Sequence, residues 1–343
     1  MERGSTEWGW GGVQAQGVVI AALLRRCGLL ALVGLLLVSG LSGCAWLDVK
    51  QRGWIYRPTP GQWADWQPIT PQDEALWLAL PAAETRLTTP ASTPQRLRAV
   101  WVPAADAAAP GVLYLHGTFR NLFQNRAKIA AIHAAGFSVL AVDYRGWGES
   151  SPLLPSEASI VDDAEVAWAE LQRRVPNPAA RIIFGHSMGS GAATELALRH
   201  RSGGADGGHG TAGTGGTDGS YGALVLESAM TSMPDIASAQ GLVGRVAAWL
   251  TTQQFASIDK IAAISAPKWF LSGTADNTVP SRQTQQLYTA ALGQRQLVLF
   301  EGGSHSGLAQ EFPARYRAVW QQVAETLRDI ANRSPNPSPT AQR

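Results

Sequence analysis

The residues best suited to chemistry in this chain centre on Ser187, in the sequence Gly185-His186-Ser187-Met188-Gly189. An apolar run at 181–184 precedes this segment, and a helix-like pattern follows from Ala192. This order predicts a strand, a tight turn that carries the serine, and a helix. Glycines two positions either side of the serine permit a turn too sharp for side chains. The Ser187 hydroxyl would then stand clear of the backbone, near the positive end of the helix.

Glycine is common in this chain, so the same motif could be an ordinary turn that happens to hold a serine. The distinction depends on partners, because a serine hydroxyl needs a base, and the base needs an orienting carboxylate. Asp276 follows the predicted strand at 268–271, and His305 follows the next one at 296–300. Residues just past the carboxyl ends of parallel strands share one edge of the sheet. We therefore predict that Ser187, Asp276 and His305 converge.

Glu227 is the alternative acid, because it directly follows the predicted strand at 223–226. We favour Asp276, whose Gly-x-x-Asp-x-x-Val-Pro context is the usual acid turn after a strand. His305 is favoured as the base because the other five histidines lie in other motifs, in helices or in a glycine tract. Three further aspartates are interpreted as charges on helix surfaces: Asp162, Asp163 and Asp259.

Acyl transfer also needs N–H donors for the negative charge that develops on a carbonyl oxygen. The backbone of Met188, directly after the serine, is one candidate. The other is Thr118 in His116-Gly117-Thr118, which follows the predicted strand at 111–115. We predict that the Thr118 and Met188 N–H groups form an oxyanion hole, although an ordinary glycine-containing turn at residue 117 is the alternative.

From residue 97 onward, short apolar runs alternate with amphipathic stretches, which predicts an α/β fold with a mostly parallel central sheet flanked by helices. The predicted strands are Leu97–Val102, Gly111–Leu115, Ser138–Val142, Arg181–Phe184, Ala223–Leu226, Lys268–Leu271 and Gln296–Phe300. The predicted helices are Asn121–Ala135, Ser159–Arg174, Ser187–His200, Pro234–Thr251, Ser281–Leu292 and Gln310–Ile330. The interval between Ser228 and Lys268 leaves room only for a small helical cap.

Composition excludes several function classes. The chain has 28 Lys and Arg against 26 Asp and Glu, so no nucleic-acid surface is expected. Its six histidines are scattered, without H-x-x-x-H or C-x-x-C spacing, and we expect neither a metal site nor a cofactor. Cys27 and Cys44 are the only cysteines.

Residues 1–43 resemble a lipoprotein-type signal peptide, with Arg25-Arg26 before an apolar run and a lipobox-like Leu41-Ser42-Gly43-Cys44. The resemblance implies that lipid on Cys44 anchors the protein to a membrane of the bacterial cell envelope. The outer membrane is mildly favoured, because Ala45 stands where aspartate would suggest inner-membrane retention. A plain signal peptide or a membrane anchor with an incidental cysteine is the alternative.

The rest of the chain divides by composition. Residues 44–95 are expected to be a tether and an irregular Trp- and Pro-rich lead-in, whose tryptophans cover the domain or meet lipid. The main domain should span 96–331 and contain a flexible Gly-rich insertion at 202–220. A disordered Ser- and Pro-rich tail is expected at 332–343.

Taken together, the motifs resemble the α/β-hydrolase superfamily of serine hydrolases over about residues 50–330. The loop at 142–150 and the Leu-Glu-Ser turn at 226–228 are similar to a small-lid group that includes eukaryotic membrane-tethered deacylases. The family commonly has Asn after His-Gly, where this chain has Thr118. The donor is a backbone group, so activity should survive this change. Asp143 and Arg145 are expected to fix their loop rather than to react.

The resemblance implies that the protein cleaves a carboxylic ester or thioester through an acyl-enzyme, on a small-molecule or lipid-linked acyl substrate. Two alternatives stay open. One is a lipid-anchored relative that binds a ligand or partner without catalysis, because fold does not fix function. The other is a serine peptidase on the same triad, although nothing marks a charged substrate terminus. Apolar residues of the cap could line an acyl pocket or form helix core: Met230, Met233, Leu242, Val243, Val246, Trp249 and Leu250.

Overall fold

The structure, a computed structural model, describes residues 45–61, 67–81, 94–201, 221–239 and 241–333. The chain divides into two compact units, Met1–Gln51 and Arg52–Arg343. In the first unit, residues 45–51 are helical. The predicted signal peptide, Cys44, the glycine-rich insertion and most of the predicted tail lie outside the described residues. Lipid anchorage through Cys44 therefore stays a prediction.

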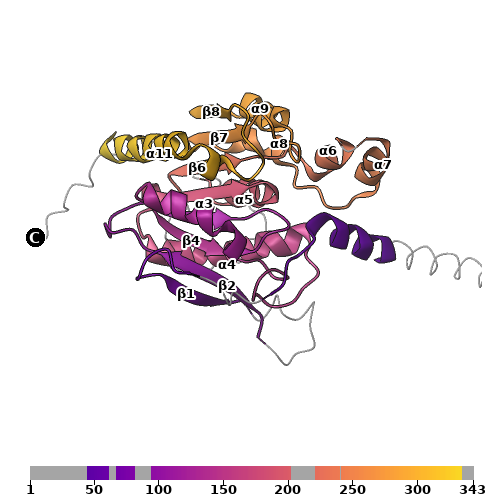
Figure 1. The fold of residues 1–343 in the computed structure, drawn as a ribbon, viewed down its shortest axis with the longest axis horizontal. Coiled ribbons are helices and arrows are strands. Elements are labelled where there is room, and N and C mark those ends of the chain that lie inside the picture. Colours follow the sequence, from indigo (N-terminus) through magenta and orange to yellow (C-terminus); the bar gives the residue numbers. More distant parts are fainter. Residues whose placement is uncertain (1–44, 62–66, 82–93, 202–220, 240, 334–343) are drawn as a thin grey trace, which may run out of the picture. The chain divides into compact units, whose positions relative to one another are not determined.

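One eight-stranded sheet organises the second unit, in the spatial order β1-β2-β4-β3-β5-β6-β7-β8 (Figure 1). Its strands are β1 Glu74–Ala79, β2 Arg96–Val102, β3 Gly111–Leu115, β4 Ser138–Val142, β5 Arg181–His186, β6 Ala223–Glu227, β7 Lys268–Gly273 and β8 Arg295–Phe300. β2 pairs antiparallel with β1 and β4, and all other neighbours are parallel. The sheet confirms the predicted fold class, the α/β-hydrolase fold, and contains every predicted strand.

β1 is a strand that the composition did not predict. It lies in the Trp- and Pro-rich lead-in and pairs only with β2, at the edge of the sheet. Of its six residues only Leu78 is buried, so it lacks the apolar run that marks the central strands. Trp77 is exposed on this edge, with the Arg96 guanidinium 3.8 Å from its ring centroid. An edge strand needs little apolar character, because only one neighbour and one face cover it.

Helices cover both faces of the sheet. They are α3 Leu122–Ala134, α4 Glu157–Arg174, α5 Met188–Arg199, α6 Met233–Ser238, α7 Leu242–Leu250, α8 Ser257–Lys260, α9 Ser281–Ala290, α10 Leu308–Glu311 and α11 Pro313–Arg333, with short 3-10 turns at Pro178–Ala180 and Ile261–Ala263. Over the described ranges, none of the helices combines the length and the apolar character needed to cross a membrane.

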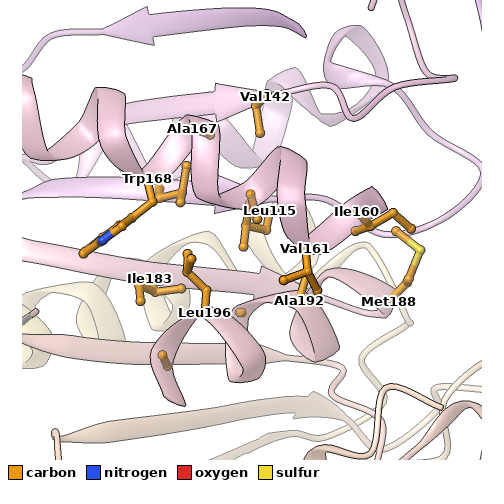
Figure 2. Packing of buried hydrophobic residues seen from close by; sticks show 14 of the residues in the cluster. Leu115, Val142, Ile160, Val161, Ala167, Trp168, Ile183, Met188, Ala192 and Leu196 are labelled. Atoms are coloured by element: carbon orange, nitrogen blue, oxygen red, sulfur yellow. The ribbon is translucent and has the colours of Figure 1, made fainter. Parts of the chain in front are cut away.

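Alternating side chains of the strands feed two separate cores. Leu113 and Leu115 of β3 face a core shared with α4 and α5, in which Figure 2 shows Trp168, Val161 and Leu196 packed together. Val112 and Tyr114 of the same strand face the core shared with α3 and α11. Central parallel strands are thus buried on both faces, which explains their continuous apolar runs.

The cap differs from the single helix predicted over 234–251. Two helices, α6 and α7, occupy this interval, and Gly241 begins α7 with φ at 88°, in the left-handed region that favours glycine. Met230 and Met233 are buried in the core. The apolar residues of α7 are exposed instead: Leu242, Val243, Val246, Trp249 and Leu250. The residues considered for an acyl pocket therefore divide between core and surface.

Candidate active site

Ser187 occupies a strained turn between β5 and α5. Its φ is 56°, in the left-handed region that non-glycine residues rarely adopt. A Cβ on Gly185 would overlap the Gly189 carbonyl oxygen, and one on Gly189 would overlap the carbonyl oxygens of Leu115 and His116. Both glycines are therefore required by close approach of the backbone, as the sequence predicted.

Three side chains form one hydrogen-bonded line. The Ser187 hydroxyl donates to Nε2 of His305 at 3.0 Å, and the His305 Nδ1–H donates to Oδ2 of Asp276 at 2.7 Å. The other Asp276 oxygen accepts the backbone N–H groups of Thr278 at 2.9 Å and Val279 at 2.8 Å. The carboxylate is thereby fixed, and it selects the tautomer in which Nε2 is free to take the serine proton.

The parallel sheet accounts for this convergence. Ser187, Asp276 and His305 follow β5, β7 and β8, whose carboxyl ends point to the same edge. The two loops that carry the acid and the base are also joined. The Ala275 N–H donates to the Gly303 carbonyl at 3.1 Å, and a Cβ on Gly273 would overlap Gly303. Close backbone packing therefore holds the carboxylate and the imidazole at hydrogen-bond distance.

Two further residues, to which the sequence analysis assigned no role, hold His305 by its backbone. The His305 carbonyl accepts the His186 Nε2–H at 3.0 Å and the Ser228 hydroxyl at 2.9 Å. Both side chains are buried, and burial lowers the pKa of His186 well below its ordinary value, so the ring stays neutral. Ser228 has φ at 49°, a second strained position at this edge. The Leu-Glu-Ser turn at 226–228 marked Ser228 as part of a motif, but its spacing did not indicate this contact.

Replacing Ser228 with alanine should lower kcat about fivefold, since one hydrogen bond that positions His305 is worth about 1 kcal/mol. KM should change little, because the Ser228 hydroxyl is bound to the His305 carbonyl rather than exposed in the cleft. Steady-state kinetics with a p-nitrophenyl ester would measure both constants. An unchanged kcat in Ser228→Ala would exclude this positioning role.

A cleft of about 370 Å³ opens beside Ser187 and His305. The other residues that line it come from three loops, the end of β5 and α3: Gly117, Thr118, Phe119, Arg120, Asn125, His186, Thr278, Ser304 and Ser306. Thr118 thus lies in the wall next to the serine, on the loop after β3. Met188 is the first residue of α5, whose N-terminal N–H groups have no side-chain cap. Both predicted oxyanion donors therefore flank Ser187.

The loop after β4 is fixed by two aspartates. Asp143 accepts the Leu122 N–H at the start of α3 at 2.8 Å. Arg145 donates to Asp163 from Nε and from its backbone N–H, both at 2.7 Å. The prediction that Asp163 is a surface charge is therefore wrong. Asp163 is fully buried on the inner face of α4, where the ion pair with Arg145 satisfies it.

Glu227, the alternative acid, is engaged elsewhere. Its side chain is fully buried, one carboxylate oxygen pairs with the Lys128 ammonium, and the other accepts the Tyr316 hydroxyl at 2.8 Å. Burial lowers the pKa of Lys128, and the Glu227 charge opposes that shift. The imidazole of His305 contacts Asp276 instead. Within the part of the chain that the structure describes, no group of His, Cys, Asp and Glu side chains could hold a metal ion.

The chain is similar in sequence to several known proteins. Residues 107–209 match the family described as serine aminopeptidase, S33. An uncharacterized protein of Mycobacterium tuberculosis is 28% identical over 293 residues, which cover 82% of this chain and 90% of that one. The lysophosphatidylserine lipase ABHD12 of Danio rerio is 29% identical over 206 residues, 56% of this chain and 50% of its own.

Solved structures show the same fold at low identity. An esterase of Pyrococcus furiosus aligns with a TM-score of 0.58 at 16% identity, over 79% of this chain and 96% of its own. An α/β hydrolase of Vibrio vulnificus aligns with a TM-score of 0.54 at 19% identity, over 72% and 81%. The sheet order, the turn at Ser187 and these likenesses show that the chain has the α/β-hydrolase fold.

Proposed function

We propose that this protein is a serine hydrolase that cleaves a carboxylic ester or thioester through an acyl-enzyme. The observation that carries the proposal is the line from the Ser187 hydroxyl through His305 to Asp276, beside an open cleft. A base within hydrogen-bond reach of a serine, oriented by a fixed carboxylate, is the arrangement that makes a hydroxyl nucleophilic at neutral pH.

The chemistry follows from the distances that join Ser187 to His305 and His305 to Asp276. The Ser187 oxygen attacks the substrate carbonyl while its proton passes to Nε2 of His305. The Thr118 and Met188 N–H groups stabilise the oxyanion that forms. When the tetrahedral species collapses, His305 gives the proton to the departing oxygen or sulfur, which leaves the acyl group on Ser187. Water, deprotonated by His305, then attacks the acyl-enzyme and releases the acid.

The cleft favours ester chemistry over aminopeptidase chemistry. An aminopeptidase must bind a substrate ammonium group, for which a carboxylate is the natural partner. None of the eleven residues that line the cleft is Asp or Glu, and one of them is Arg120. The named relatives described as a lipase and an esterase support the same choice. The complete serine–histidine contact argues against a purely binding role.

A substrate panel tests this assignment. The purified full-length protein should hydrolyse p-nitrophenyl esters of rising chain length, or the matching acyl thioesters, with kcat/KM above about 10⁴ M⁻¹s⁻¹ for the best of them. Aminoacyl p-nitroanilides should react far more slowly, because the cleft offers no anionic partner for an ammonium group. Spectrophotometric rates on all three series supply the comparison. Preferential cleavage of the anilides would favour the peptidase, and no turnover of any series by folded protein would favour the binder.

A further inference from the structure

We infer that Arg120 gives the cleft a binding point for an anionic group, a phosphate or a carboxylate, carried by the substrate. The inference rests on the proposed function and adds a substrate class to it. It starts from the position of one guanidinium relative to the Ser187–His305 pair.

Arg120 lies on the same loop as a predicted oxyanion donor. The loop runs from β3 to α3, and both Thr118 and Arg120 line the cleft that contains Ser187 and His305. Between them, Phe119 takes φ of 69°, which turns the loop. The Thr59 hydroxyl donates to the Phe119 carbonyl at 2.9 Å and ties this turn to a neighbouring segment. The backbone that carries Arg120 is therefore anchored next to the reacting atoms.

The Arg120 guanidinium is exposed and has free donors. In the part of the chain that the structure describes, Arg120 makes neither an ion pair nor a side-chain hydrogen bond, whereas Arg145 is fully engaged by Asp163 and Gln95. An arginine presents N–H donors in a planar fork that matches the two oxygens of a carboxylate or phosphate. An unengaged fork at a cleft wall is thus suited to an incoming oxyanion.

The surrounding charges favour an anion as well. The lining contains no acidic side chain, and Arg120 is the one Lys or Arg in it. The Arg120 charge adds to burial in lowering the pKa of His186, which lines the cleft, and of Lys128. A substrate anion would meet a positive potential here, whereas a substrate cation would be repelled.

The dimensions limit the group that binds. A cleft of about 370 Å³ lies at the lower end of the range for ligand sites, so it accommodates a compact charged group together with the scissile bond. The hydroxyls of Thr278 and Ser306 supply further polar wall. The substrate expected is therefore an ester or thioester with a phosphate or carboxylate close to the cleaved bond.

Matched esters test this inference. The leaving-group series is 4-butyryloxybenzoate and 4-butyryloxyphenyl phosphate against the neutral 4-butyryloxybenzamide. The acyl-side pair is mono-4-nitrophenyl adipate against 4-nitrophenyl hexanoate. Each rate is corrected for the alkaline hydrolysis rate of the same ester. In the wild type, at least one anionic ester should exceed its neutral partner in kcat/KM by about tenfold, the effect of one exposed charge-assisted contact.

Variants assign that preference to Arg120. Arg120→Met should reduce the anionic-to-neutral ratio to near one, and Arg120→Lys should keep part of it, because a point charge replaces the fork. Arg317→Met is the matched control: Arg317 is exposed on α11 and does not line the cleft, so its variant should keep the wild-type ratio. A wild type without preference, or an Arg120→Met variant that retains it, would overturn the inference.

A binding measurement separates this result from the proposed function. Phenyl phosphate, benzoate and inorganic phosphate are titrated calorimetrically into Ser187→Ala and into Ser187→Ala/Arg120→Met. The double variant should bind the preferred anion about tenfold more weakly, whether or not any ester is hydrolysed. Equal binding by the two variants would contradict the role of Arg120 even if hydrolysis is normal. Anion binding that depends on Arg120, without turnover of any ester, would contradict only the proposed hydrolase.

Discussion

Replacing Ser187 with alanine should lower kcat for the best p-nitrophenyl ester by about six powers of ten, as removal of the nucleophile does in other serine triads. The Ser187 hydroxyl is the group that His305 activates, at 3.0 Å, and alanine leaves that base without a proton to take. Alanine can keep the backbone of the turn, since it adds no atoms at a position that already holds a side chain. Stopped-flow and long-time assays of both proteins would measure the two rates.

The residual rate of Ser187→Ala and two control variants show whether the loss of kcat is due to the missing nucleophile. Oxyanion donors and binding alone can leave about 10³-fold catalysis over water, so Ser187→Ala need not be inert. Adding His305→Ala to Ser187→Ala should lower kcat little further, because the two residues act as a unit. Ser265→Ala removes an exposed serine outside the cleft and should keep wild-type kcat. A Ser187→Ala variant that retains more than a hundredth of wild-type kcat would refute the assigned nucleophile.

Replacing Lys128 with methionine should lower the free energy of unfolding by about 3–5 kcal/mol, the usual cost of leaving one member of a buried ion pair without its partner. The Lys128 ammonium pairs with Glu227, and the Glu227 carboxylate is fully buried. Without the lysine, the Tyr316 hydroxyl is the one side-chain partner left to the carboxylate among the residues that the structure describes. Urea denaturation followed by tryptophan fluorescence and by circular dichroism would give the free energy, provided that the two transitions coincide.

A double-variant cycle isolates the charge effect. Lys128→Met/Glu227→Gln removes both charges and keeps an oxygen that can accept from Tyr316. It should therefore recover most of the stability lost by Lys128→Met, with a coupling energy above about 1 kcal/mol. A double variant as unstable as the sum of the single losses would show that packing, rather than the unpaired charge, sets the loss of stability.

Replacing Asp276 with asparagine should lower kcat by about 10⁴, as the same change does in other triads.

Local sequence patterns were sufficient to predict a residue's role where that role depends only on the strand and turn that carry the residue. The apolar run of β5, the glycines around Ser187 and the helix that follows are all encoded within twenty residues, and the structure forms them as predicted. The approach of Asp276 and His305 also followed from sequence, because parallel strands bring their carboxyl ends to one edge.

Features that depend on distant partners could not be predicted. Asp163 was assigned to the surface by residue type. In the structure it is buried on α4, where it forms an ion pair with Arg145 of the loop after β4. The hydrogen bonds from His186 and Ser228 to the His305 carbonyl join the end of β5 to two loops, and no local spacing indicates them. β1 was not predicted because it pairs with β2 alone and therefore lacks the apolar run of a central strand. Gly241 at the start of α7 divides the cap, where the apolar period alone suggested one continuous helix.

The most direct test of the central claim is to trap the acyl group on the protein. A p-nitrophenyl ester that turns over slowly is mixed with enzyme, quenched in acid during the steady state and examined by intact-mass and peptide mass spectrometry. We expect a mass increase equal to the acyl group, located on Ser187, and no adduct in Ser187→Ala. Turnover without any adduct on Ser187, or an acyl group carried by a different residue, would contradict the central claim.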